Sequence, residues 1–179
     1  LPGESRGQFH NTGETSDWNE VALATASFGQ RFTVTPMQMI TMVSAIVDDG
    51  KLKKPYVVKN VLNADGTVKS TTEPEVLRQV ISEDTSAYMR EAMEQVVANG
   101  TGKNAYVPGY RVGGKTATSQ TLPRGSGRYI SSFIGFAPAD DPQVIAIAII
   151  NNPQGIYYGG QVAAPIIRQL YENILPYLG

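Results

Sequence analysis

The sequence contains no cysteine and a single histidine, His10, among its 179 residues. A disulfide and a thiol nucleophile are therefore excluded, and a serine-histidine-aspartate system would depend on His10, which lies in a polar segment. The acidic pairs Glu83-Asp84 and Asp140-Asp141 are expected at a helix amino end and in a turn. The sequence thus predicts neither a metal site nor a cofactor.

The sequence also has little net charge and no long apolar run. Its formal net charge is -1, which gives no reason to expect nucleic acid as a partner. The apolar run at 144–150 has the length of a strand rather than of a membrane span, and no signal peptide is visible. With 41% hydrophobic and 17% charged residues, the composition predicts one globular domain with a sizeable core.

Three strands are predicted in the second half of the chain. They cover 110–120, 128–137 and 144–150, and a loop rich in proline, glycine and serine joins the first two. The short connections favour antiparallel neighbours. The 144–150 run, which is β-branched or alanine throughout, is typical of a central strand covered on both faces.

The first half of the chain predicts two helices followed by a hairpin. A short helix is expected over 18–27. Thr35-Pro36-Met37-Gln38 forms a capping box with proline at the first helical position, and the helix that follows has a buried stripe of Met39, Ile40, Met42, Val43, Ile46 and Val47. Segments 56–62 and 67–70 flank an Asp65-Gly66 turn and therefore predict a hairpin.

Two further helices complete the expected fold. Ser82 caps a helix that ends at Gly100 and whose apolar residues are Met89, Ala92, Met93, Val96 and Val97. The last helix has Pro165 in its first turn and Pro176 at its end, and its apolar stripe is Ala163, Ile166, Ile167, Leu170, Tyr171, Ile174 and Leu175. The sequence therefore predicts an α+β domain in which helices flank an antiparallel sheet.

The segment from Gly113 to Gln120 fits two unrelated active-site signatures. Counted from Gly109, the pattern Gly-x-x-x-x-Gly-Lys-Thr is that of the phosphate-binding loop of nucleotide hydrolases. That loop requires a buried strand before it and a helix after it. Residues 99–108 are rich in helix and strand breakers and 116–121 favours a strand, so both flanks disfavour the phosphate loop.

The second signature belongs to a known family. Lys115-Thr116-Ala117 resembles the Lys-Thr-Gly strand of penicillin-binding proteins and serine β-lactamases. Six segments of the chain stand in the order found in class B penicillin-binding transpeptidases, namely Leu1-Pro2-Gly3-Glu4, Phe28-Gly29-Gln30, Thr35-Pro36-Met37-Gln38, Gly100-Thr101-Gly102, Lys115-Thr116-Ala117-Thr118 and Ser132-Phe133-Ile134-Gly135-Phe136. The chain resembles that family along its whole length. This resemblance implies that residues 1–179 form the carboxyl-terminal part of one transpeptidase domain, with a partial penicillin-binding/serine β-lactamase-like fold.

The resemblance implies roles for four neighbouring residues. Lys115 provides positive charge, the hydroxyls of Thr116 and Thr118 bind the carboxylate of substrate or β-lactam, and the Thr118 backbone N–H donates to the oxyanion. Ala117 stands where the family most often has glycine. Strand alternation places Lys115 and Ala117 on one face and the two threonines on the other, so one ligand reaches all four only along an exposed strand edge.

The nucleophile of the family is absent from the chain. No Ser-x-x-Lys and no Ser-x-Asn occurs in it, and the resemblance implies that both motifs lie upstream. Tyr171-Glu172-Asn173 imitates a variant of the second motif, but it belongs to the predicted final helix. This chain is therefore expected to be inactive alone.

The resemblance implies a parent protein that is a serine-type D,D-transpeptidase. Such an enzyme crosslinks peptidoglycan stem peptides ending in D-alanyl-D-alanine and binds β-lactams. It would work with other cell-wall synthesis proteins at the extracytoplasmic face of the bacterial membrane, held there by an upstream anchor. Two alternatives stay open, which are a non-catalytic relative that binds peptidoglycan precursor or an assembly partner, and a phosphate-loop nucleotide hydrolase.

Overall fold

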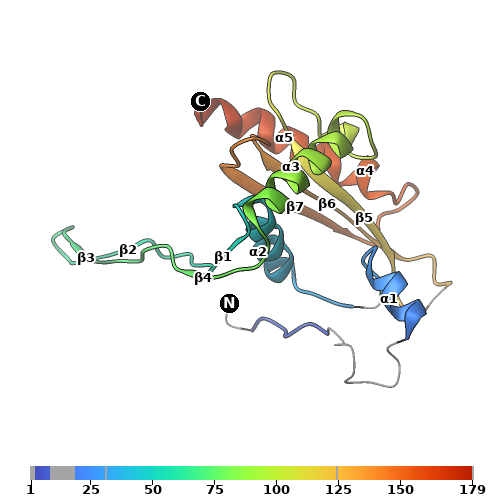
Figure 1. The fold of residues 1–179 in the computed structure, drawn as a ribbon, viewed down its shortest axis with the longest axis horizontal. Helices are drawn as coiled ribbons and strands as arrows, with labels where there is room; N and C mark the ends of the chain where they lie inside the picture. Colours follow the sequence, from blue (N-terminus) through green and yellow to red (C-terminus); the bar gives the residue numbers. More distant parts are fainter. Residues whose placement is uncertain (1–2, 9–18, 31, 124, 179) are drawn as a thin grey trace.

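The structure is a computed structural model that describes residues 3–8, 19–30, 32–123 and 125–178. Two helices, four short strands, a long helix, three longer strands and two final helices follow one another along this part of the chain (Figure 1). The helices are α1 (Glu20–Ala26), α2 (Pro36–Val47), α3 (Glu83–Ala98), α4 (Gly159–Val162) and α5 (Ala164–Ile174), with 3-10 turns η1 (Lys103–Ala105) and η2 (Leu175–Tyr177). The strands are β1 (Lys51–Lys53), β2 (Asn60–Leu62), β3 (Val68–Thr71), β4 (Val76–Gln79), β5 (Gly113–Gln120), β6 (Tyr129–Ala137) and β7 (Val144–Asn151).

The main sheet has the strand order β5-β6-β7, with both neighbouring pairs antiparallel. This confirms the predicted α+β class and the three predicted strands, although β5 begins three residues later than expected. Within the sheet of the described residues, the prediction that 144–150 is the central strand was wrong, because β6 lies between the other two. The run is apolar because helices cover both faces of β7, with α5 packed on one side and α2 on the other.

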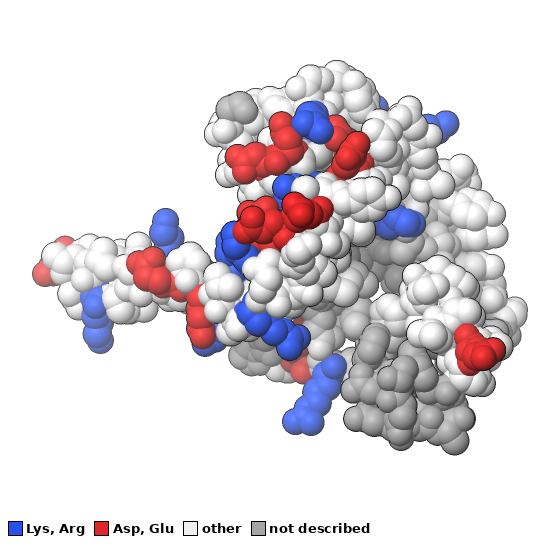
Figure 2. Space-filling view, viewed as in Figure 1, with Lys and Arg blue, Asp and Glu red and all other residues white. Residues whose placement is uncertain are grey.

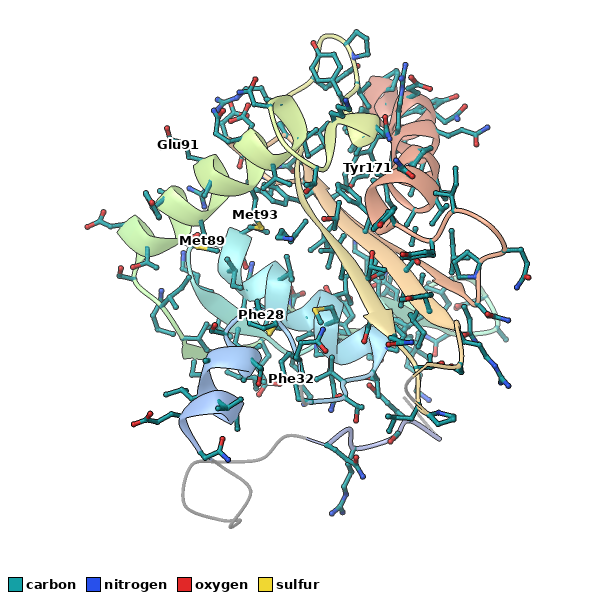
Figure 3. The ribbon with its side chains drawn as sticks, turned by 90° about the vertical axis from the view of Figure 1, so that its right-hand side faces the viewer. Phe28, Phe32, Met89, Glu91, Met93 and Tyr171 are labelled. Carbon is teal, nitrogen blue, oxygen red and sulfur yellow. The ribbon has the colours of Figure 1, made fainter. Side chains whose placement is uncertain are left out.

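The sheet separates two hydrophobic cores. One core joins Phe133 to Val97, Ile167 and Tyr171, which come from α3 and α5. The other joins Phe136 to Met93 of α3 and to buried residues of α2, namely Val43 and Val47. In Figure 3, the side chain of Tyr171 lies on the side of α5 that faces the sheet, and Met93 points from α3 toward α2 and the sheet. Because α3 contributes to both cores, it fixes the end of β5 against which it packs.

The predicted helix starts are confirmed where a cap specifies them. The Thr35 hydroxyl accepts from Gln38 N at 3.1 Å while the Gln38 side chain accepts from Thr35 N at 2.9 Å, which is the predicted capping box. Ser82 accepts from Thr85 N at 3.1 Å and starts α3. Asn19 caps α1, whose predicted first residue, Trp18, lies outside the described residues.

Three members of the predicted apolar stripes are exposed instead of buried. Met42 of α2 is 48% exposed, and Ile166 and Leu170 of α5 are 47% and 40% exposed. Each lies at the border of its helix's buried face, where the period of the apolar residues does not tell which flank another element covers. The predicted apolar stripes are therefore wider than the helix faces that are buried against the sheet.

The predicted hairpin is confirmed as β2 and β3, although β2 begins four residues later than predicted, and the structure continues the hairpin toward the body. Strands β1 and β4 pair antiparallel between this hairpin and the body of the molecule, and sequence patterns did not predict these two strands. Residues 51–80, which we call the arm, project from the body as a two-stranded ribbon (Figure 1). At the root of the arm, β1 contacts α2.

Gly113 and Gly114 are explained by packing rather than by phosphate binding. A Cβ atom at Gly113 would overlap the ring of Phe136, and one at Gly114 would lie 2.5 Å from the ring of Phe133. The two phenylalanines lie on opposite faces of β6, so each glycine accommodates one ring. Gly114, Lys115 and Thr116 are all within β5, and the strand and helix order required by a phosphate loop is not present.

This packing predicts that Gly114→Ala destabilises the fold. The added methyl group must displace the Phe133 ring or the Ile134 carbonyl, which would lie 2.6 Å away. We expect a loss of about 1–3 kcal/mol in the free energy of unfolding, measured by urea denaturation. Ser119→Ala, an exposed position on the same strand, is the control and should change stability by less than about 0.5 kcal/mol. Equal stability of the two variants would contradict this account.

Candidate active site

Strand β5 is the outer strand on its side of the described sheet, so one of its edges is open. Thr121 N donates to Arg128 O at 2.9 Å, and the register pairs Thr118 with Ser131. In an antiparallel pair, residues that bond to the neighbouring strand alternate with residues whose N–H and C=O point away from it. The backbone groups of Thr116 and Thr118 therefore face the open edge, as the predicted oxyanion role of Thr118 requires.

The side chains of the two threonines lie on the face of β5 against which α4 packs. The Thr118 hydroxyl accepts from Gly159 N at 3.0 Å, and the Thr116 hydroxyl lies 3.2 Å from the hydroxyl of Thr101. Both threonines are half-buried. A ligand carboxylate at this edge would meet three hydroxyl groups from two segments of the chain.

Lys115 and Ala117 lie on the opposite face of β5 and are exposed. The Lys115 ammonium bends toward the open edge, where it donates to the Thr116 carbonyl at 2.9 Å. The structure thus brings the charge of Lys115 and the polar groups of Thr116 and Thr118 to one strand edge. Strand alternation had given an exposed edge as the condition under which one ligand could reach these residues.

A hollow of about 500 Å³ opens beside the threonines. Besides Thr116 and Thr118, its lining consists of Gly100, Thr101, Lys103, Asn104, Tyr158, Gly159, Gly160 and Gln161. Sequence reasoning did not assign the 158–161 segment to the site. The pair Gly159-Gly160 could have indicated this segment in the sequence, because the backbone here comes too close to other segments for a side chain. A Cβ atom at Gly159 would overlap the carbonyl of Ala117, and one at Gly160 would overlap the carbonyl of Thr101.

Arg111 holds the segment that leads into β5. Its guanidinium donates to both carboxylate oxygens of Glu94 on α3, at 2.8 and 2.6 Å, and lies 3.2 Å from Asp140. Its carbonyl accepts from Ala139 N at 2.8 Å. The hydrogen bonds from Arg111 hold the pKa of Glu94 below its ordinary value, although burial acts in the opposite direction. The start of β5 is therefore tied to α3 and to the β6–β7 turn.

Other candidate groups have structural roles or lie outside the described residues. His10 is outside them. Tyr171, the first residue of the Tyr-Glu-Asn triplet, is buried in α5 as expected, where its hydroxyl donates to Gly135 O at 2.6 Å and burial raises its pKa. Within the described ranges, no cluster of three or more histidine, cysteine or acidic side chains is placed to hold a metal ion. No helix in these ranges is long and apolar enough to cross a membrane.

The fold and the Lys-Thr-Ala-Thr edge strand define a transpeptidase domain of the penicillin-binding type. The family model for the penicillin binding protein transpeptidase domain matches residues 1–172. The chain belongs to this family, and within it to the class B proteins. Relatives named as peptidoglycan D,D-transpeptidases, such as the probable enzyme PenA of Neisseria flavescens at 32% identity, place the family in that enzyme class.

The chain is similar to part of several longer proteins. It is 48% identical over 166 residues to stage V sporulation protein D of Bacillus subtilis, which covers 89% of the chain and 25% of that protein. It is 33% identical to the penicillin-binding protein PbpB of Mycolicibacterium smegmatis, over 98% of the chain and 28% of that protein. Among these curated relatives, the chain spans about a quarter of each length.

Solved structures show the same fold. Penicillin binding protein 3 of Mycobacterium tuberculosis, complexed with aztreonam, matches with a TM-score of 0.84 and 31% identity, over 99% of this chain and 42% of that one. The transpeptidase domain of Burkholderia pseudomallei penicillin-binding protein 3 matches with a TM-score of 0.80 and 30% identity, over 100% of this chain and 52% of that one. The antiparallel sheet between helices is thus the fold of penicillin-binding transpeptidase domains.

The Arg111–Glu94 pair predicts a pH-dependent contribution to stability. Because the folded-state pKa of Glu94 lies below its ordinary value, the pair stabilises the fold above that ordinary value, and the stabilisation disappears as the pH falls through the lowered pKa. Glu94→Gln should therefore be less stable than the unchanged protein at neutral pH, and the difference should shrink in acid. Urea unfolding at a series of pH values measures this.

The matched control for this prediction is Glu91→Gln. Glu91 is exposed on the same helix and points to solvent (Figure 3). Its replacement should change the unfolding free energy by less than about 0.5 kcal/mol. If Glu94→Gln lost the same stability at every pH, the ion pair would not be the cause.

Proposed function

We propose that the chain is the carboxyl-terminal part of the transpeptidase domain of a peptidoglycan D,D-transpeptidase. In this reading β5 forms one wall of the cleft that binds stem peptides ending in D-alanyl-D-alanine, and β-lactams in their place. The observation that carries the proposal is the open edge of β5, toward which Thr118 N–H, Thr116 C=O and the Lys115 ammonium are directed. Relatives named as D,D-transpeptidases support the reaction.

Each residue at the edge has a distinct part in the proposed acyl transfer. Lys115 supplies positive charge that attracts the substrate carboxylate. The hydroxyls of Thr116 and Thr118 donate hydrogen bonds to that carboxylate, and the Thr118 N–H donates to the oxygen that becomes negative in the tetrahedral intermediate. A donor fixed in a sheet does not have to reorganise as that charge develops, which is why a strand edge suits this role.

The proposed nucleophile is a serine supplied by another part of the parent protein. The chain contains no Ser-x-x-Lys, and it spans 25% of the sporulation protein and 52% of the Burkholderia domain. Within the described residues no strand pairs with the outer edge of β7, which is long and mostly apolar. Such an edge favours pairing with a further strand, so we infer that the rest of the domain joins there.

The proposed setting is the extracytoplasmic face of a bacterial cell membrane, where peptidoglycan is crosslinked. An anchor would be supplied by a part of the parent outside this chain, and cell-wall synthesis proteins would be its partners. The aztreonam complex of the Mycobacterium tuberculosis relative supports β-lactam binding. A non-catalytic relative that only binds peptidoglycan precursor remains the second candidate, and the experiment below separates the two.

Intact mass after incubation with a β-lactam tests the proposal. The parent protein should gain the mass of the drug, whereas the 179-residue chain alone should keep its mass because it lacks the nucleophile. In the parent, Lys115→Ala should slow acylation by roughly 10- to 100-fold, the effect of losing one hydrogen bond to a charged group. Lys69→Ala on the arm is the matched control and should acylate at the normal rate.

The possible outcomes of this experiment are distinct. A parent protein that gains no mass would favour the non-catalytic relative. A mass gain on the chain alone would show a nucleophile within it and overturn the inferred division of the domain. Acylation of the Lys115→Ala parent at the normal rate would show that Lys115 does not contribute to the site.

The methyl group of Ala117 is expected to restrict how closely a ligand can approach β5. Its exposed methyl group stands on β5 between the two threonines, where glycine would let a ligand approach the backbone more closely. We expect Ala117→Gly to raise the acylation rate of the parent by roughly tenfold, the lower end of the effect of one carbon atom in a binding site. Stopped-flow acylation by a chromogenic β-lactam measures it. An unaltered rate would show that the methyl group does not contact the ligand.

A further inference from the structure

The arm is a second surface for which the transpeptidase reaction has no use. Residues 53–80 are all exposed, and β2 and β3 contact each other rather than the main sheet or its helices. The ribbon extends away from the body in the direction opposite to β5 (Figure 1). What the arm presents to its surroundings is therefore independent of the cleft.

The arm is internally ordered despite its exposure. At the tip, the Asp65 carboxylate accepts from the N–H and the hydroxyl of Thr67, at 3.0 and 2.6 Å. At the root, the Gln79 amide donates to the carbonyls of Asp49 and Ile81, each at 2.6 Å. Lys54 and Glu75 pair across the ribbon at 3.1 Å. A surface already held in one shape loses little conformational entropy when it binds.

One edge of the ribbon is open and apolar. Thr72 N donates to Lys59 O at 2.7 Å, so Lys59 bonds across the ribbon and the N–H and C=O of the next residue, Asn60, point outward. Apolar side chains next to this edge are strongly exposed, at 78% for Val57 and 57% for Val58, which precede β2, and at 45% for Val61 and 56% for Leu62 within it. An isolated two-stranded ribbon is marginally stable, and a third strand would satisfy the edge and cover these side chains.

The charge of the arm indicates which kind of strand would fit. The arm contains six lysine or arginine residues and three acidic ones, whereas the whole chain contains 15 and 16, so the body has nine basic and thirteen acidic residues. Figure 2 shows basic side chains on both sides of the arm. Complementary charge steers association and favours an acidic partner segment.

We propose that the outer edge of the arm formed by β2 and by residues 57–59 before it binds an extended segment of a partner protein that alternates apolar and acidic residues, and that this segment adds as a third strand. Backbone hydrogen bonds from groups such as those of Asn60 would supply affinity, and the exposed valines and lysines would select the sequence. This proposal does not rest on the acyl-transfer chemistry.

Two other occupants fit the arm less well. A hairpin that enters a lipid bilayer presents apolar or aromatic residues at its tip, whereas the tip here is Asn63-Ala64-Asp65-Gly66-Thr67. A second copy of the arm, paired edge to edge, would bring the lysines of two basic ribbons together. Both remain outcomes of the test below.

The test uses the parent protein and a fluorescent synthetic peptide of about ten residues, the length of a long strand, that alternates valine and glutamate. Asn60→Pro removes an outward N–H without removing a hydrogen bond of the ribbon, as proline on an edge strand allows. We expect Asn60→Pro to weaken peptide binding, measured by fluorescence anisotropy, by roughly tenfold or more, while Asn60→Ala, which keeps the N–H, stays within about twofold. A peptide that alternates valine and lysine should bind at least roughly tenfold more weakly than the acidic one.

The remaining measurements separate the alternatives. Binding to phosphatidylglycerol vesicles but not to the acidic peptide would overturn the proposal in favour of a membrane surface. Self-association in sedimentation that Asn60→Pro abolishes, without peptide binding, would overturn it in favour of a second copy. Equal peptide binding by Asn60→Pro and Asn60→Ala would also overturn it, because strand addition needs the N–H. Acylation of Asn60→Pro by a β-lactam at the normal rate shows that the body of the variant is folded, so a failure of the arm proposal is distinct from a failure of the transpeptidase proposal.

Discussion

The contact of two phenylalanine rings with two glycines organises most of this structure. Phe133 and Phe136 come from the central strand and enter the two cores on opposite faces of the sheet, and each ring occupies the space that a side chain at Gly114 or Gly113 would fill. Since α3 supplies residues to both cores, the rings connect that helix to the first residues of β5. The position of Lys115, directly after Gly114, therefore depends on packing in both cores at once.

The features that local chemistry specifies were predicted well. Capping side chains at Thr35 and Ser82 determine where α2 and α3 begin, because they satisfy backbone N–H groups within a few residues of themselves. The features that were predicted wrongly or not at all depend on residues that are distant in the chain. Which strand lies in the centre, which flank of α2 is covered, and whether 51–53 pairs with 76–79 are decided by tertiary packing, for which the sequence contains no short-range signal.

The same distinction applies to the candidate site, in which the part formed by one strand could be predicted and the part formed by distant segments could not. Alternation along one strand was enough to predict that Lys115 and Thr118 meet only at an open edge, and the register and backbone hydrogen bonds of β5 agree. The roles of these residues stay predictions. The lining contributed by Thr101 and by Gly159 could not be read from spacing, since these residues reach β5 from beyond the end of α3 and from the start of α4. The paired glycines at 159 and 160 are the mark that this close backbone approach leaves in the sequence.

The oxyanion donor proposed at this edge belongs to the main chain, and this limits how evolution can alter it. Every residue except proline carries an N–H, so replacing Thr118 changes the hydroxyl and leaves the donor in place. A lineage under selection by a drug that exploits this donor would therefore have to displace the strand. Displacement is opposed by the aromatic contacts at Gly113 and Gly114 and by the tether at Arg111, so loss of this donor would require changes in the segments that hold β5 in place rather than a replacement of Thr118 itself.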